Sequence, residues 1–192
     1  MKHIGIFGGS FDPIHSGHLA LAQSAVEELK LNVIYFVPAK ISPFKIGVSP
    51  VSADHRIHML KSVMFRVPKS KISYIEMKKQ SPSFTVDTIE KFKKRFSKSK
   101  LFLIMGSDAY LKFQQWKEWD KILKMCTLVV GKRKGKNNLY VPQKRIPNVI
   151  VLKGTYPHIS STEFREEIRK GRKRMKGLPS EVFQYISAHH FY

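Results

Sequence analysis

Two histidines three positions apart, His15 and His18, follow a glycine-containing turn near the start of the chain. The turn contains Gly8 and Gly9, comes directly after the apolar run Ile4–Phe7, and precedes a helical pattern. A helix N-terminus in this position binds phosphate, because its first N–H groups lack partners within the helix and small residues let the backbone approach the anion. Imidazoles at the same place predict phosphate chemistry as well as phosphate binding.

Two other interpretations of the histidine pair stay open at this point. A His-x-x-His pair can bind a metal ion, but the sequence offers no third ligand cluster, and Cys126 is its single cysteine. Imidazoles can also cap and pack a helix start, with the glycines forming an ordinary turn. The motifs elsewhere in the chain have to decide between these interpretations.

Apolar runs of strand length alternate with helix-periodic segments along the whole chain. Strands are predicted at His3–Phe7, Val33–Val37, Ile72–Met77, Leu101–Met105, Thr127–Val130 and Val149–Leu152. Helices are predicted at Leu19–Leu29, Ala53–Phe65, Val86–Arg95, Thr162–Lys170 and Ser180–His189, with an interrupted helix across Ala109–Lys124. This alternation predicts an α/β fold with a doubly wound, Rossmann-like parallel sheet and helices on both faces.

In such a sheet, ligands bind beyond the carboxyl ends of the strands, at the point where the strand order reverses. Gly8 and Gly9 follow the first predicted strand, and Gly106, Ser107 and Asp108 follow the fourth. We therefore expect these two segments to face one another across a single crevice.

A second group of anion-binding residues precedes the helix expected at Thr162–Lys170. Ser160 and Ser161 supply hydroxyl groups, the spacing of Ser160 and Glu163 predicts a capping box, and Arg165 lies one turn further along. Hydroxyls, free N–H groups and a guanidinium at one helix start predict a second anion site.

Together these motifs resemble those of the bacterial nicotinate-nucleotide adenylyltransferases, over essentially the full length of the chain. The His15-Ser16-Gly17-His18 variant of the (T/H)xGH signature and the segment Ile159–Arg165 mark the wider nucleotidyltransferase superfamily. The segments Gly106–Ile122 and Ser81–Thr85, with Thr85 as a helix N-cap, are specific to this member. The chain departs from the family pattern where Ser42-Pro43-Phe44-Lys45 replaces Pro-Pro-His-Lys, and where Lys40 replaces a polar Asn.

The resemblance implies an enzyme of NAD biosynthesis that transfers AMP from ATP to nicotinate mononucleotide, giving deamido-NAD and pyrophosphate. Nicotinamide mononucleotide and phosphopantetheine are the alternative acceptors within the superfamily. A single domain over residues 1–192 is expected, with a C-terminal helical part of about residues 160–192 that completes the ATP site. The resemblance also implies Mg²⁺ that is bound with the ATP phosphates, mostly through phosphate and water ligands, with no metal-ligating residue of the protein named.

The residues of the site follow from the same resemblance. The catalytic residues are expected to be His15, His18, Lys45 and Arg165. The ATP-binding residues are expected to be Gly8, Gly9, Ser10, Phe11, His15, His18, Gly106, Asp108, Ser160, Ser161, Thr162 and Arg165. Those for nicotinate mononucleotide are expected to be Lys40, Lys45, Ser83, Phe84, Thr85, Trp116 and Arg133. Trp116 is expected to stack on the pyridine ring, whereas Phe7, Phe92 and Leu103 are predicted to be core residues only.

The chain is strongly basic, with 35 Lys and Arg against 14 Asp and Glu and a formal net charge of +21. Such a charge attracts polyanions, either nucleic acid or phosphorylated small molecules. The basic residues lack the regular aromatic interleaving of an RNA-binding module, which favours a solvated basic surface over a dedicated nucleic-acid site.

The single cysteine fits a reducing compartment, and no apolar run reaches the roughly 18 residues that a membrane span needs. We therefore expect a cytoplasmic protein without a membrane partner. The oligomeric state, a homo-oligomer included, is left open.

Overall fold

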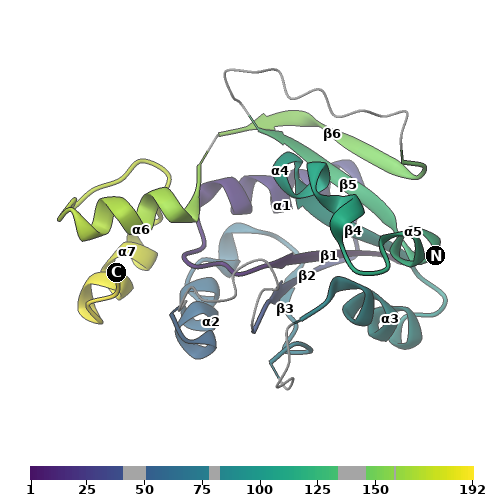
Figure 1. The fold of residues 1–192 in the computed structure, drawn as a ribbon, viewed down its shortest axis with the longest axis horizontal. Helices are drawn as coiled ribbons and strands as arrows, with labels where there is room; N and C mark the ends of the chain where they lie inside the picture. Colours follow the sequence, from purple (N-terminus) through teal and green to yellow (C-terminus); the bar gives the residue numbers. More distant parts are fainter. Residues whose placement is uncertain (41–50, 78–82, 134–145, 158) are drawn as a thin grey trace.

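The computed structural model describes residues 1–40, 51–77, 83–133, 146–157 and 159–192. Within them, parallel strands form one sheet in the order β3-β2-β1-β4-β5-β6 (Figure 1). The strands are β1 His3–Gly9, β2 Val33–Pro38, β3 Ser70–Ile72, β4 Lys100–Gly106, β5 Thr127–Arg133 and β6 Val149–Tyr156. This is the order of a doubly wound sheet, with its reversal between β1 and β4. The predicted fold class is confirmed.

Successive residues of a strand point to opposite faces of the sheet, and the core is divided accordingly. Phe7 and Ile104 pack on one face, together with α1 Ser16–Glu28, α2 Ala53–Lys61 and α7 Ser180–Ala188. Ile6 and Leu103 pack on the other. That face is covered by three further helices: α3 Thr85–Arg95, α4 Ser107–Leu111 and α5 Trp119–Met125.

One predicted strand is placed wrongly. The segment Ile72–Met77 was predicted as a strand from its apolar residues, but β3 ends at Ile72 and, among the described residues, pairs with β2 alone. Beyond it the chain turns, because the Met77 N–H donates to the carbonyl of Tyr74 at 3.1 Å. Glu76 then points inward to Thr88, and Tyr74 is 45% exposed. An edge strand needs few ladder bonds, so polar Ser70 and Lys71 can form it.

The helix boundaries differ from the predicted ones in three informative places. The first helix begins at Ser16, three residues before the predicted Leu19, so that His15 is its N-cap and His18 lies in its first turn. The interrupted pattern across Ala109–Lys124 separates into α4, a 3₁₀ turn η3 at Phe113–Gln115, and α5. The helix predicted at Ala53–Phe65 ends at Lys61 and is followed by a 3₁₀ turn, η2 Met64–Arg66.

Strand β1 runs from the N-terminus toward the end of the molecule where α6 Ser161–Arg169 and α7 lie (Figure 1). The last two helices thus gather beyond the carboxyl end of β1, in the region where a doubly wound sheet binds ligands. Among the described residues, no helix is long and apolar enough to cross a membrane.

Candidate active site

A cavity of about 520 Å³ lies at the reversal point of the sheet. Gly8 and Gly9 at the end of β1 line it on one side, and Gly106 at the end of β4 lines it on the other. Gly8, Gly9 and Gly106 thus share one crevice as expected, whereas Ser107 and Asp108 do not line it. A cavity of this volume holds a ligand of nucleotide size.

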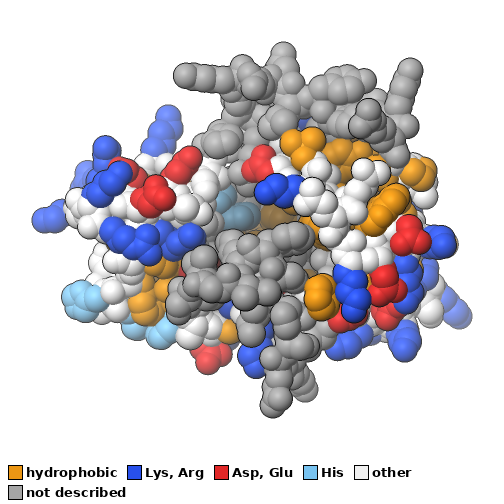
Figure 2. Space-filling model, in the orientation of Figure 1, with side chains coloured by type: hydrophobic (Ala, Val, Ile, Leu, Met, Phe, Trp, Pro, Cys, Tyr) orange, Lys and Arg blue, Asp and Glu red, His pale blue; other side chains and the backbone are white. Residues whose placement is uncertain are grey.

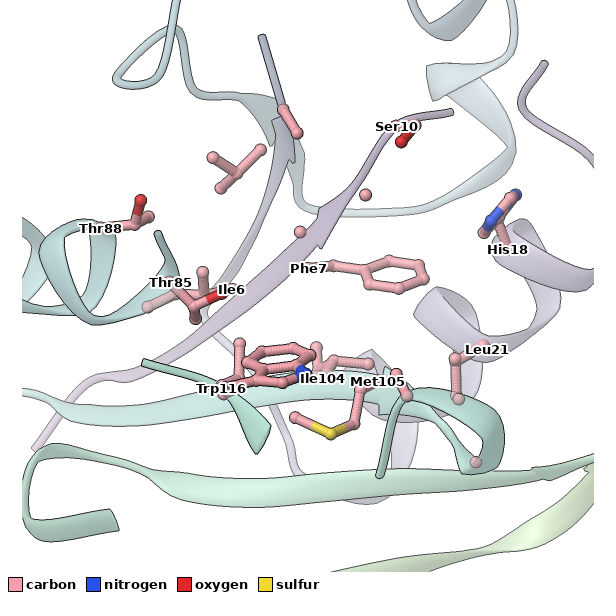
Figure 3. Close-up of a pocket in the computed structure, with 18 of the residues that line it drawn as sticks. Ile6, Phe7, Ser10, His18, Leu21, Thr85, Thr88, Ile104, Met105 and Trp116 are labelled. Carbon is pink, nitrogen blue, oxygen red and sulfur yellow. The ribbon is translucent and has the colours of Figure 1, made fainter. Parts of the chain in front are cut away.

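His18 and Trp116 lie on different sides of this cavity, with the ring of Phe7 between them (Figure 3). Thr85 and Thr88 of α3 lie on the side away from His18 (Figure 3). The cavity therefore has one side built by the start of α1 and another built by the start of α3.

The two histidines are locked together at the N-terminus of α1. His15 is the N-cap residue, and its backbone N–H donates to Nδ1 of His18 at 3.3 Å. The two rings stack with centroids 3.7 Å apart. Because Nδ1 of His18 accepts a hydrogen bond, the proton of the neutral ring lies on Nε2. His18 can then donate from Nε2 to an anion.

Phe11 holds the turn that precedes the histidines. Its backbone has φ of +50°, and its side chain is 1% exposed. The ring packs edge-on against His18, with centroids 5.2 Å apart, and against Phe7 at 5.6 Å. Phe11 was predicted to bind ATP, but its side chain is a core residue beneath His18 and does not line the cavity.

The start of α3 forms the opposite side of the cavity. Ser83, Phe84 and Thr85, which are predicted to bind nicotinate mononucleotide, all line it. Thr85 was predicted as the N-cap, whereas Phe84 occupies that position and Thr85 is the first helical residue. The Oγ of Ser83 is buried and has no hydrogen-bond partner among the described residues. Free N–H groups of a helix start beside such a hydroxyl suit a carboxylate.

Lys117 is a cavity residue that the sequence reasoning missed. Its Nζ lies 4.7 Å from the centroid of the Phe84 ring, so a positive charge lies beside the start of α3. The neighbouring Trp116 follows the 3₁₀ turn rather than lying within a helix, and it is half-buried against Phe113, with ring centroids 5.4 Å apart. One face of the indole is therefore available to form the cavity wall.

Several apolar residues of the cavity wall were also missed. Phe7 and Leu103 were assigned to the core alone, yet both line the cavity as well. Glu76 belongs to the wall too, and its carboxylate accepts a hydrogen bond from Thr88 Oγ1 at 2.6 Å. Buried residues at a strand end serve packing and ligand contact together, and hydrophobic pattern alone does not separate the two roles.

The second predicted anion site flanks the cavity without lining it. Ser160 caps α6 by accepting a hydrogen bond from the Thr162 N–H at 3.2 Å, which confirms the predicted helix start to within one residue. The Ser161 hydroxyl donates to the Pro13 carbonyl at 3.0 Å, and Arg165 donates to the Asp12 carbonyl at 2.8 Å. These bonds hold the start of α6 against the turn before His15.

The remaining residues predicted for the site either do not line the cavity or lie outside the described residues. Lys40 and Asp108 do not line the cavity, and Asp108 is exposed. Lys45 lies outside the described residues, as does the side chain of Arg133. In the described ranges, no group of three or more His, Cys, Asp or Glu side chains could hold a metal ion.

Comparisons with known proteins agree with this geometry. A family model described as cytidylyltransferase-like matches residues 6–167. A protein of Thermus thermophilus named "Probable nicotinate-nucleotide adenylyltransferase" is 38% identical over 189 residues, which cover 98% of each chain. A protein of Methylacidiphilum infernorum with the same name is 36% identical over 98% of this chain and 91% of its own length.

A solved structure with the same fold is the nicotinic acid mononucleotide adenylyltransferase of Plasmodium falciparum complexed with NaAD. It has a TM-score of 0.75 and 21% identity, over 99% of this chain and 97% of that one. The chain belongs to the cytidylyltransferase-like family and, within it, to the nicotinate-nucleotide adenylyltransferases.

Proposed function

We propose that this enzyme transfers the adenylyl group of ATP to nicotinate mononucleotide, giving deamido-NAD and pyrophosphate. The observation that carries the proposal is that one cavity has the His15–His18 pair on one side and Trp116 with the start of α3 on the other. The family of the chain and the names of its relatives support the same reaction.

In this reaction an oxygen of the mononucleotide phosphate bonds to the α-phosphorus of ATP, and the bond from that phosphorus to the α,β-bridging oxygen breaks, so that the oxygen leaves with pyrophosphate. The nucleophile is already an anion, so the reaction needs no general base. The barrier comes from the approach of like charges and from the charge that grows on the leaving pyrophosphate. Catalysis therefore consists of positioning and electrostatic stabilisation.

His18 supplies the donor at the centre of this step. Its Nε2–H is directed by the bond that Nδ1 accepts from His15, and it would donate to the α-phosphate. Lys45 is proposed to approach the phosphates as a second cation. The N–H groups at the start of α1 and the backbone of Gly8, Gly9 and Ser10 would hold the same phosphates.

The start of α6 would hold the β,γ-phosphates through Ser160, Ser161, Thr162 and Arg165, and Asp108 would accept hydrogen bonds from ribose hydroxyls. On the acceptor side, Trp116 would stack on the pyridine ring and the start of α3 would bind the carboxylate. Lys40 and Arg133 are the further acceptor contacts that the resemblance implies.

Mg²⁺ fits this site as a companion of ATP. Glu76 is the carboxylate among the lining residues, and it is engaged by Thr88. The ion's ligands would be phosphate oxygens and water, and it would neutralise charge on the leaving group. The chain's own part is to hold those phosphates at the starts of α1 and α6.

A pyrophosphate-release assay with three acceptors tests the proposal. Nicotinate mononucleotide should give the highest kcat/KM, and phosphopantetheine should give no turnover above background. Preferred turnover of phosphopantetheine would assign the chain another reaction of the superfamily. We further propose a cytoplasmic location, which cell fractionation would test.

A further inference from the structure

The turn before the histidines is held from outside the cavity through its carbonyl groups. Arg56 of α2 donates from Nη1 to the Ser10 carbonyl at 2.6 Å. Arg165 and Ser161 of α6 bind two further carbonyls of the turn, those of Asp12 and Pro13 respectively. In a trans peptide the carbonyl and the following N–H point in opposite directions, so the bond to Ser10 also orients the Phe11 N–H.

A buried charge cluster lies behind this turn. Asp12 is 3% exposed and Arg56 is 1% exposed. The Tyr192 hydroxyl donates to Oδ1 of Asp12 at 2.5 Å, and Nη1 of Arg165 lies 3.9 Å from Oδ2. Arg56 also binds the Val51 and Lys40 carbonyls. Buried charges persist only where partners surround them, so the members of this cluster fix one another's positions.

The phenol of Tyr192 is a donor under ordinary conditions. Burial raises the pKa of Tyr192 well above its usual range, and the hydrogen bond to the Asp12 carboxylate raises it further. The hydroxyl therefore stays protonated at every pH at which the enzyme would be assayed.

Helix α7 brings Tyr192 to this place by packing on α2. The Tyr185 hydroxyl is 2.8 Å from Nδ1 of His55, and the Tyr185 ring stacks on His58 with centroids 4.2 Å apart and an angle of 12°. Both histidines belong to the helix that also carries Arg56. Arg56 of α2 thus binds Ser10, and Tyr192, which follows α7, binds Asp12.

The contact from this turn to the catalytic group runs through Phe11. The ring of Phe11 packs on His18. Ser10, which precedes Phe11 in the chain, lines the cavity. Asp12, Arg56 and Tyr192 do not line the cavity themselves. A change in the cluster would alter where His18 and Ser10 lie without removing any group that touches a substrate.

We propose that Tyr192, Asp12 and Arg56 are positioning residues for adenylyl transfer, which hold the Ser10–Pro13 turn so that His18 meets the phosphate. The proposal rests on the proposed function and adds to it residues that touch neither substrate. Tyr192 matters through its hydroxyl group, so the ring alone should not be sufficient.

The test is Tyr192→Phe, which removes one oxygen and keeps the ring. The matched control is Tyr74→Phe, because Tyr74 is exposed and does not line the cavity. We expect Tyr192→Phe to lower kcat about tenfold, the equivalent of one hydrogen bond to a charged group, with both KM values unchanged to within about twofold. Tyr74→Phe should behave as the wild type.

A second variant and a second readout complete the test. Asp12→Asn keeps an acceptor for Tyr192 but leaves Arg56 without its counter-charge, and its kcat should fall at least as far. Assigned imidazole signals of His18 in ¹H–¹⁵N spectra should shift in both variants and stay in place in Tyr74→Phe.

A kcat for Tyr192→Phe within twofold of the wild type would overturn the proposal, whatever happens to the melting temperature. A wild-type enzyme without adenylyl-transfer activity would refute the proposed function instead. The His18 imidazole signals of Tyr192→Phe and Asp12→Asn would then test the positioning role by itself. Signals that do not shift from their wild-type positions would overturn that role.

Discussion

At the scale of single residues, the chemistry depends on which nitrogen of His18 faces the phosphate. The bond from the His15 N–H to Nδ1 leaves Nε2 as the donor, and the stacked rings keep that orientation. Such a preorganised donor needs no rearrangement when charge develops in the transition state.

Replacing His18 by Ala should therefore lower kcat by about 10²–10³, the scale for the loss of one preorganised donor. The melting temperature should change little, because the side chain is only half-buried and lines the cavity. The control is His190→Asn at an exposed position with φ of +53°, which Asn tolerates. If the turnover of His18→Ala were close to that of the wild type, the catalytic role of His18 would be refuted and helix capping would remain as its role.

Trp116 allows a similarly direct test of stacking. If the indole stacks on the pyridine ring, Trp116→Ala should weaken acceptor binding by roughly 1–3 kcal/mol and affect the KM for ATP far less. Trp119 packs on the same Phe113 but does not line the cavity, so Trp119→Ala is the control. A melting loss that corresponds to about 3–5 kcal/mol, with the ratio of the two KM values unchanged, would show that Trp116 is a core residue.

The sequence identified the residues with distinctive chemistry but not the apolar wall between them. His15, His18 and Trp116 occur in recognisable motifs, and all three line the cavity. Phe7 and Leu103 have the pattern of buried strand residues, which they also are. Only their position at the carboxyl end of the sheet brings them into contact with the cavity.

At the scale of elements, the starts of α1, α3 and α6 carry the site, and they were predicted with unequal accuracy. Hydrophobic periodicity placed α3 and α6 to within one residue. It placed the start of α1 three residues late, because Ser16–His18 has no apolar periodicity although the chain is already helical there. The cluster of Asp12, Arg56 and Tyr192 joins residues up to 180 positions apart, which no local pattern indicates.

The start of α3 with Lys117 should set the preference between acid and amide acceptors. Charge-assisted hydrogen bonds are about twice as strong as neutral ones, so nicotinate mononucleotide should be favoured over the amide by at least about tenfold in kcat/KM. Lys117→Ala should reduce this ratio, whereas Lys112→Ala, at an exposed position away from the cavity, should leave it unchanged. Equal kcat/KM values for the two mononucleotides in the wild type would contradict the carboxylate role of this helix start.

At the scale of the whole molecule, the charge of +21 is distributed over the surface. Lys and Arg side chains lie over α6 at one end of the face in Figure 2 and over the opposite end, with a hollow between them where hydrophobic side chains are visible (Figure 2). An apolar cavity within a basic surface attracts phosphorylated ligands over a distance and then binds their bases by contact.

The core should protect the single thiol of the chain. Burial raises the pKa of Cys126 to about 12, so the thiolate that alkylating reagents need is nearly absent at pH 8. Iodoacetamide should leave the native protein unmodified over hours and label it stoichiometrically in denaturant, as followed by intact mass. Rapid labelling of the native protein would show that the α5–β5 junction opens readily.

The account as a whole depends on the identity of the product. Mass spectrometry of the wild type incubated with ATP, Mg²⁺ and nicotinate mononucleotide should show deamido-NAD and pyrophosphate in equal amounts. His18→Ala under the same conditions should show them only in traces, and phosphopantetheine should give no adenylylated product. Absence of deamido-NAD from the wild-type reaction, or an adenylylated pantetheine in its place, would contradict the assignment of the cavity to ATP and nicotinate mononucleotide.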